Sequence, residues 1–150
     1  MAKIGFTMGV YDLLHKGHVR FFERAKAICD YLIVGVVSDE AVRNKKGPNR
    51  PMMSQKERMY LVKALKPVDE VMPLQSFNPI IELEKKFTNV LEEKEGSYYK
   101  NTLAMFIKGE DQEHIHHGYA LIHDIPLVYI QRTPDISTSE TIRRMNNVSN

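Results

Sequence analysis

The stretch that decides the fold lies early in the chain, at residues 3–37, and reads KIGFTMGVYDLLHKGHVRFFERAKAICDYLIVGVV. Lys3–Met8 predicts a strand, and the loop that follows leads into a predicted helix over Gly17–Ile28, whose apolar residues recur every third position. Tyr31–Val37 is a continuous apolar, largely β-branched run, typical of a strand that is buried on both faces. The stretch therefore predicts a strand, a helix and a second, buried strand.

The same alternation continues to the end of the chain. Further strands are predicted at 68–72, 103–107 and 127–130; further helices are predicted at 54–65, 78–87 and 112–123 and from Ser137 onward, with loops at 44–51 and 92–101. Two of these helices open with capping boxes, Ser54 with Glu57 and Ser137 with Glu140. We therefore predict one α/β domain over residues 1–150, with a Rossmann-like, doubly wound, mostly parallel sheet of five strands.

Composition excludes several classes of protein. The 150 residues are 43% hydrophobic, enough for one core, and the net charge of +2 lacks the basic excess of a nucleic-acid-coating protein. The longest apolar run is far shorter than the roughly 20 residues that span a bilayer, and the N-terminus shows no signal-peptide pattern. Cys29 is the single cysteine. We expect a cytoplasmic protein without membrane or nucleic-acid partners.

The loop after the first strand places two histidines around a glycine, in His15-Lys16-Gly17-His18. The glycine allows close approach of the backbone to a ligand, and the start of a helix offers unpaired N–H groups to an anion. Imidazoles at this place can donate to phosphate oxygens and stabilise charge in a transition state. Taken alone, the pattern is equally compatible with two ordinary turn histidines.

Two further segments point to phosphate. Arg132–Ser139 follows the last predicted strand and combines a guanidinium, several hydroxyls and another helix start, which together form a second candidate phosphate cradle. A basic segment contains Lys45, Lys46 and Arg50 and is followed by Arg58. By itself each segment has a plainer interpretation, a capped helix or a solvated loop. Because ligands of such sheets bind beyond the carboxyl ends of the strands, the segments together predict one phosphate-binding site.

Gly9–His18 resembles the G-x-[FY]-D-L-x-H-x-G-H signature of the cytidylyltransferase family of nucleotidyltransferases, and Arg132–Ser139 resembles its R-T-x-G-I-S-T-S signature. The resemblance runs from about Lys3 to Met145 and is greatest to small bacterial glycerol-3-phosphate cytidylyltransferases. It implies transfer of CMP from CTP to a small phosphomonoester, glycerol 3-phosphate first, by direct in-line attack with release of pyrophosphate. It also implies Mg²⁺ carried with CTP, and a homodimer.

The resemblance assigns roles to particular residues. His15 and His18 hold the triphosphate and stabilise the transition state, Lys46 (Lys45 in the alternative register) bridges the acceptor and α-phosphates, and Arg132 holds the leaving pyrophosphate. The implied nucleotide-binding positions are Gly9, Val10, Tyr11, Asp12, Gly17, Gly109, Glu110, Asp111, Arg132, Thr133, Ile136, Ser137 and Thr138. The implied acceptor-binding positions are Lys45, Lys46, Arg58 and His114. No metal site made of protein residues is expected.

Some residues depart from the family pattern and leave alternatives open. Asp135 stands where R-T-x-G-I-S-T-S has glycine, and Glu110 stands where the family usually has aspartate; both bear on the acceptor more than on the reaction. The cluster His114–His117 is compatible with a solvated helix, part of an acceptor pocket or a metal site. Phosphocholine, phosphoethanolamine or another phosphate or phosphonate is the alternative acceptor. An ATP-using adenylyltransferase and a catalytically silent, nucleotide-binding regulatory domain are the alternative functions.

Overall fold

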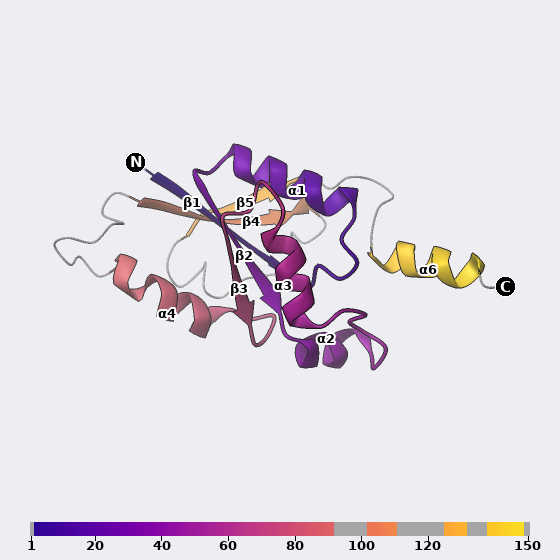
Figure 1. The fold of residues 1–150 in the computed structure, drawn as a ribbon. Helices are drawn as coiled ribbons and strands as arrows, with labels where there is room; N and C mark the ends of the chain where they lie inside the picture. Colours follow the sequence, from indigo (N-terminus) through magenta and orange to yellow (C-terminus); the bar gives the residue numbers. More distant parts are fainter. Residues whose placement is uncertain (1, 92–101, 111–124, 132–137, 149–150) are drawn as a thin grey trace.

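The computed structural model describes residues 2–91, 102–110, 125–131 and 138–148, in which strands and helices alternate along the chain (Figure 1). The elements are β1 (Ala2–Gly9), α1 (Lys16–Ala27), β2 (Tyr31–Val37), α2 (Asp39–Lys46), α3 (Gln55–Lys63), β3 (Glu70–Leu74), α4 (Ile80–Leu91), β4 (Thr102–Gly109), β5 (Leu127–Ile130) and α6 (Thr138–Val148). The predicted α/β class is confirmed.

The five strands form one sheet in the order β3-β2-β1-β4-β5, and every neighbouring pair is parallel. Parallel strands need crossover connections, and the helices that make them cover both faces of the sheet. In Figure 1, α1 lies on one side of the sheet and α4 on the other. The prediction of a Rossmann-like parallel sheet of five strands is confirmed, with β1 at its centre.

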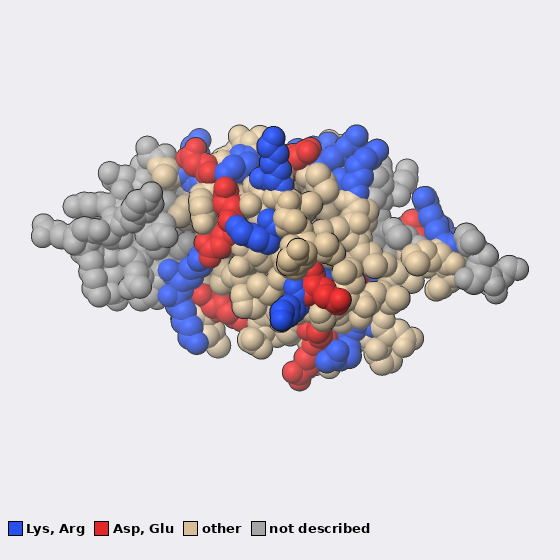
Figure 2. Space-filling view, in the orientation of Figure 1, with Lys and Arg blue, Asp and Glu red and all other residues tan. Residues whose placement is uncertain are grey.

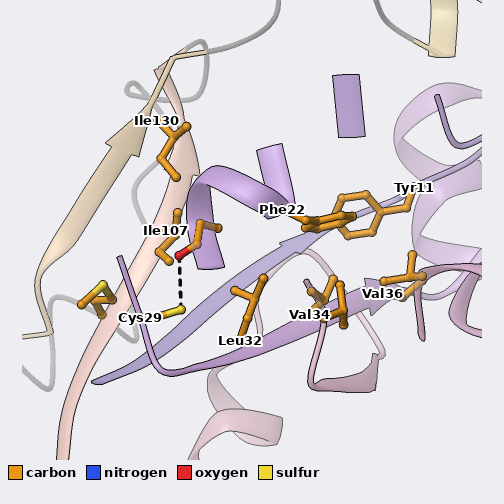
Figure 3. Close-up of a cluster of buried hydrophobic side chains, with 12 residues drawn as sticks. Tyr11, Phe22, Cys29, Leu32, Val34, Val36, Ile107 and Ile130 are labelled. Carbon is orange, nitrogen blue, oxygen red and sulfur yellow. Dashed lines mark hydrogen bonds between the residues drawn. The ribbon is translucent and has the colours of Figure 1, made fainter. Parts of the chain in front are cut away.

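The core has two halves because side chains alternate across a strand. Leu32, Val34 and Val36 of β2 join a cluster with residues of α1 and α3, which Figure 3 shows in close-up. Ile33 and Val37 point the other way and join a cluster with residues of α2 and α4. All five side chains are buried. The continuous apolar run of β2 is thus explained by burial on both faces.

The prediction that residues 44–51 form a loop is wrong for its first part. Residues 44–46 belong to α2, a helix that the sequence analysis missed. Ser38 caps this helix by accepting a hydrogen bond from a first-turn N–H at 3.2 Å. Acidic residues in the first turn and basic residues in the last complement the helix dipole, and Gly47 ends the helix at a φ of 101°. Lys45 and Lys46 therefore lie on the last turn of a helix.

Strand β3 begins at Glu70, later than the predicted Val68. Asp69 precedes the strand, and its carboxylate accepts a hydrogen bond from the N–H of Leu32 at 2.7 Å. Pro73 is tolerated in β3 because this is an edge strand of the sheet. The remaining predicted elements are confirmed with shifted ends, except that the predicted helix at 112–123 and the segment 92–101 lie outside the described residues.

The two predicted capping boxes differ in outcome. The box of Ser54 and Glu57 is present at the start of α3, with both reciprocal hydrogen bonds. Ser137 lies outside the described residues, whereas Glu140 forms ion pairs with Arg143 and Arg144 further along α6. These hydrogen bonds lower the pKa of the Glu140 carboxyl to about 2.

The surface mixes charges of both signs. On the face shown in Figure 2, basic and acidic side chains are interspersed over the helices. Within the described ranges, no helix has the length and apolar character needed to cross a membrane.

Gly35 in β2 is closely packed against side chains of the two neighbouring strands. A Cβ atom there would lie 2.5 Å from Leu74 Cδ1 and 3.0 Å from Phe6 Cζ. We expect Gly35→Ala to lower the free energy of unfolding by about 1–3 kcal/mol, the usual cost of overpacking, in urea denaturation. Ala27→Ser, at an exposed position of α1, serves as the control and should unfold near the wild-type urea concentration. A wild-type midpoint for Gly35→Ala would contradict this close packing.

Candidate active site

The predicted site segments leave the sheet side by side. In the strand pairing, Phe6 lies opposite Phe106, and Gly109 lies opposite Ile130. Continued along β1, this register brings Gly9, Gly109 and Ile130 into one row at the carboxyl edge of the sheet. The H-x-G-H loop, the turn after β4 and the segment after β5 therefore start next to one another. This edge, at the point where connections diverge from β1 and β4, is where open parallel sheets bind ligands.

The two histidines of the H-x-G-H motif form the start of α1. His15 is the N-cap residue, and its Nδ1 accepts a hydrogen bond from the N–H of Gly17 at 3.0 Å. His18 returns the contact, because its Nδ1 accepts from the N–H of His15 at 3.2 Å. The two rings stack with their centroids 3.9 Å apart. Since each Nδ1 is an acceptor, each neutral imidazole carries its proton on Nε2 and is a donor there.

The backbone before the motif has two left-handed residues that are not glycine. Tyr11 has a φ of 54° and Leu13 a φ of 50°, one on each side of Asp12. Such conformations are unfavourable for L side chains and persist where the surroundings hold them. One holding contact is the Tyr11 ring, which packs against Phe22 at 5.1 Å and meets the edge of His18 at 5.7 Å (Figure 3). The loop is thus held in a conformation that it would not adopt alone.

Tyr11 differs from its predicted role as a nucleotide contact. Its side chain is buried in the core, where burial raises the pKa of the phenol well above its usual range and keeps it neutral. Any nucleotide contact at Tyr11 would therefore come from its main chain. The same ring explains Gly9, because a Cβ there would lie 2.9 Å from Tyr11 Cζ. Gly9 is required by this tyrosine as well as by any close approach of a nucleotide.

Asp12 fastens the loop to the segment between α2 and α3. Its side chain is fully buried, and its carboxylate oxygens accept hydrogen bonds from the N–H groups of Met52 at 2.7 Å and Met53 at 3.0 Å. The guanidinium of Arg50 lies beside it, with Nε 3.5 Å from Oδ2. These contacts order the loop and connect it to the segment at 50–53.

Arg58 has a different environment from the predicted contact with an acceptor phosphate. It is completely buried, and its guanidinium donates to three acceptors: Val10 O at 2.7 Å, Met53 O at 3.0 Å and Asp39 Oδ1 at 2.6 Å. Every nitrogen of the group is therefore engaged with protein. Arg58 joins the H-x-G-H loop, the segment before α3 and the start of α2, so we correct its role to that of a positioning residue.

The structure separates the two lysines of α2. The ammonium of Lys45 lies 4.1 Å from the centroid of the Phe77 ring, a cation–π contact. Burial, followed by the nearby charges of Arg50 and Lys45, lowers the pKa of Lys46, while Asp12 acts in the opposite direction. Asp12 and Arg50 thus act electrostatically on Lys46, whereas the ammonium of Lys45 contacts Phe77.

Other predicted site residues fall at the edge of, or outside, the described chain. Gly109 ends β4 and Glu110 follows it directly, while Gly17 lies in the first turn of α1. Thr138 is the first residue of α6. The positions outside the described residues are Asp111, His114, Arg132, Thr133, Ile136 and Ser137. Arg24 of α1 donates to Gln131 O at 2.6 Å and so anchors the chain just before Arg132.

The sequence analysis missed residues that belong to this region. Lys108 is buried at the end of β4, its ammonium 6.0 Å from the centroid of the Tyr129 ring, and burial lowers the pKa of Lys108. A lysine next to Gly109 at the end of an apolar strand was the available signal. Asp39 was missed because the helix that it begins, α2, was itself missed. In the described part of the chain, no three His, Cys, Asp or Glu side chains converge as a metal site.

Comparison with known proteins decides the family. The sequence profile of the cytidylyltransferase-like family matches residues 6–144. The chain belongs to this family. The match covers the H-x-G-H loop, the basic turn of α2 and the segment after β5 in one continuous span.

Relatives of this cytidylyltransferase-like chain include longer proteins. It is 47% identical over 78 residues to the bifunctional protein HldE of Helicobacter pylori (strain P12), which covers 52% of this chain and 17% of HldE. It is 40% identical over 101 residues to HldE of Hyphomonas neptunium, covering 67% and 21% of the two chains. The chain thus spans about a fifth of the length of these relatives.

Solved structures share the fold. A lipopolysaccharide core biosynthesis protein from Thermoplasma volcanium superposes with a TM-score of 0.64 at 21% identity, covering 89% of this chain and 99% of that one. A bifunctional NMN adenylyltransferase/ADP ribose pyrophosphatase from Francisella tularensis, complexed with AMP and a manganese ion, superposes with a TM-score of 0.61 at 17% identity, covering 98% and 42%. At sequence identities of 21% and 17%, these two similarities show a shared fold and no more.

Replacement of Arg58 tests its positioning role in this cytidylyltransferase-like domain. Arg58→Met keeps a side chain of similar length but removes three hydrogen bonds and leaves Asp39 without its buried partner. We expect the free energy of unfolding to fall by roughly 2–4 kcal/mol in urea denaturation. Arg43→Met, at an exposed position of α2, is the matched control and should stay close to wild type. Equal stability of the two variants would rule out the role assigned to Arg58.

Proposed function

We propose that this chain is a nucleotidyltransferase that moves a nucleoside monophosphate from a nucleoside triphosphate to a small phosphorylated acceptor and releases pyrophosphate. The observation that carries the proposal is the pair of histidines at the start of α1, each fixed through Nδ1 with Nε2 as donor, in a loop whose Asp12 pairs with the cation Arg50. Family membership supports the same reaction.

The proposed reaction requires mainly that the protein position the two reactants and neutralise the charge of their phosphates. The phosphate of the acceptor is already ionised near neutral pH, so it attacks the α-phosphorus without a strong general base. The bond from the α-phosphorus to the bridging oxygen breaks, and pyrophosphate carries away the electron pair. Developing charge on the phosphoryl oxygens is stabilised by the Nε2 donors of His15 and His18 and by the ammonium of Lys46. In-line geometry and charge neutralisation supply most of the rate enhancement.

The remaining roles are proposed from the sequence signatures. Arg132, Ser137 and Thr138 would hold the phosphates that leave as pyrophosphate, and Arg24 fixes the chain immediately before them. Mg²⁺ bound to the triphosphate would offset part of its charge, and we propose no ligand for it among the described residues. A homodimer in the cytoplasm stays a prediction of the sequence.

Two nucleoside triphosphates are candidates for the substrate that donates the nucleoside monophosphate. The R-T-x-x-I-S-T-S form of Arg132–Ser139 favours CTP, with glycerol 3-phosphate as the first acceptor and phosphocholine, phosphoethanolamine or another phosphate or phosphonate as the alternatives. ATP is the second candidate. It is favoured by the structural neighbour named as an NMN adenylyltransferase, which was solved with AMP and manganese. A catalytically silent nucleotide-binding domain is disfavoured, because both histidines are held with Nε2 as donor.

Pyrophosphate release tests the reaction and the donor together. We expect release to require a nucleoside triphosphate, a divalent cation and a phosphorylated acceptor; CTP and ATP are each run with glycerol 3-phosphate, phosphocholine and a sugar phosphate. Release with CTP and glycerol 3-phosphate would support the first assignment, and release with ATP alone would replace CTP as the donor. No release from any pairing, by a protein that binds nucleotide in calorimetry, would favour the silent domain and reject the proposal.

His18→Asn separates catalysis from folding. The asparagine oxygen can replace Nδ1 as the acceptor of the His15 N–H, whereas the Nε2 donor is lost. We expect turnover to fall by about 10²-fold or more, the usual cost of losing one transition-state donor, while the thermal midpoint stays near wild type. His18→Ala removes the acceptor as well and should also lose roughly 1 kcal/mol of stability. Turnover near wild type in His18→Asn would refute the assigned role.

A further inference from the structure

Arg50 is a cation whose place in the site neither sequence signature assigns. Its side chain is 15% exposed and lies next to the buried Asp12, with Nε 3.5 Å from the nearest carboxylate oxygen. That distance is an ion pair and not a hydrogen bond, since charge-assisted N–H···O bonds are about 2.7–2.9 Å long. Nε and Nη2 are both buried, and neither has a hydrogen-bond partner among the described residues.

Asp12 leaves this guanidinium incompletely satisfied because its short hydrogen bonds go elsewhere. The carboxylate accepts from the N–H groups of Met52 and Met53 at 2.7 and 3.0 Å. Nε and Nη2 form one edge of a guanidinium, the edge that binds carboxylate or phosphate through two parallel hydrogen bonds. A buried donor without a partner destabilises the folded protein, so such an edge in a native protein calls for an explanation.

A second cation stands close to the first. The charge of Arg50 contributes to lowering the pKa of Lys46, so the two positive groups repel one another. Lys46 lies on the last turn of α2, and only the short segment 47–49 separates it from Arg50 in sequence. Two cations and one carboxylate leave a net positive charge, which an anion would balance.

We propose that Arg50 and Lys46 together form the subsite for the phosphate dianion of the acceptor, with Arg50 as a specificity-determining residue. The inference rests on the proposed function and adds to it a residue and a ligand class. Rotation about the side-chain bonds of Arg50 turns its Nε and Nη2 edge from Asp12 to the phosphate. The charge of Asp12 stays close to the guanidinium while this edge turns from one anion to the other.

The topology places this subsite on the acceptor side of the reacting phosphorus. Arg50 and Lys46 belong to the connection between β2 and β3, which flank β1 on one side of the sheet. The segment proposed to hold the leaving pyrophosphate follows β5, on the other side of β1. The histidines, after β1 itself, lie between the two. An in-line displacement needs the attacking and leaving groups on opposite sides of the phosphorus, and this strand order supplies that arrangement.

Binding of inorganic phosphate tests the subsite without turnover. Titration calorimetry on the full chain compares the wild type with Arg50→Gln, Arg50→Lys and the control Arg43→Gln, which removes an exposed cation from α2 one turn before Lys46. We expect Arg50→Gln to weaken phosphate binding by about tenfold or more and Arg43→Gln to leave it unchanged. Arg50→Lys keeps the countercharge of Asp12 but loses the two-pronged edge, so it should fold and bind phosphate weakly. Wild-type phosphate affinity in Arg50→Lys and Arg50→Gln would overturn the proposal.

Substrate kinetics and nucleotide binding distinguish the acceptor from the nucleotide as the source of the phosphate. In Arg50→Lys, the KM for the acceptor should rise by about tenfold, while the calorimetric affinity for CTP or ATP stays at its wild-type value. A loss confined to nucleotide affinity would overturn the assignment to the acceptor. If no acceptor gives turnover but phosphate binding still depends on Arg50, the proposed function fails and the anion subsite stands. If turnover occurs and Arg50→Lys keeps the wild-type KM for the acceptor, the proposed function stands and the anion subsite fails.

Discussion

The arrangement of this site depends on one buried guanidinium. Arg58 donates to Val10 O, Met53 O and Asp39 Oδ1, and these acceptors belong to three different segments around the carboxyl edge of the sheet. Asp12 adds a second fastening between the first and second of them. Because a buried charge is stable only when it is fully paired, these contacts are made together or not at all. The loop with the histidines and the helix with Lys46 are thereby fixed relative to one another.

This fastening also explains how an unfavourable backbone is maintained. The left-handed conformations of Tyr11 and Leu13 stand on either side of Asp12, whose carboxylate is bound from outside the loop. The cost of each conformation is offset by contacts with the core and with the segment at 52–53. As a result, His15 lies at a defined position at the start of α1. In the proposed reaction position and charge matter more than proton transfer, and a rigid site suits that requirement.

The sequence predicted the parallel sheet well, because strands such as Tyr31–Val37 carry a strong apolar pattern. It predicted the region around α2 poorly, because a short helix of charged residues has no such pattern and a basic run favours a loop. The role of Arg58 was also inaccessible, since an arginine in an amphipathic helix shows no sign in the sequence of lying inside the protein. The contact between Lys45 and Phe77 was inaccessible too, because the two residues are distant in sequence. Contacts between remote segments are what local patterns cannot supply.

The capping box at the start of α1 has a consequence for how such a domain could lose its activity. The task of accepting a backbone N–H at an N-cap is done in most proteins by serine, threonine, aspartate or asparagine. A lineage released from catalysis would drift toward these ordinary capping residues, which keep the helix without an imidazole. His15 and His18 both perform the task with Nδ1 alone. Two histidines therefore do the capping work of an ordinary serine or asparagine and in addition present the second nitrogen of each ring, the one that the helix does not use.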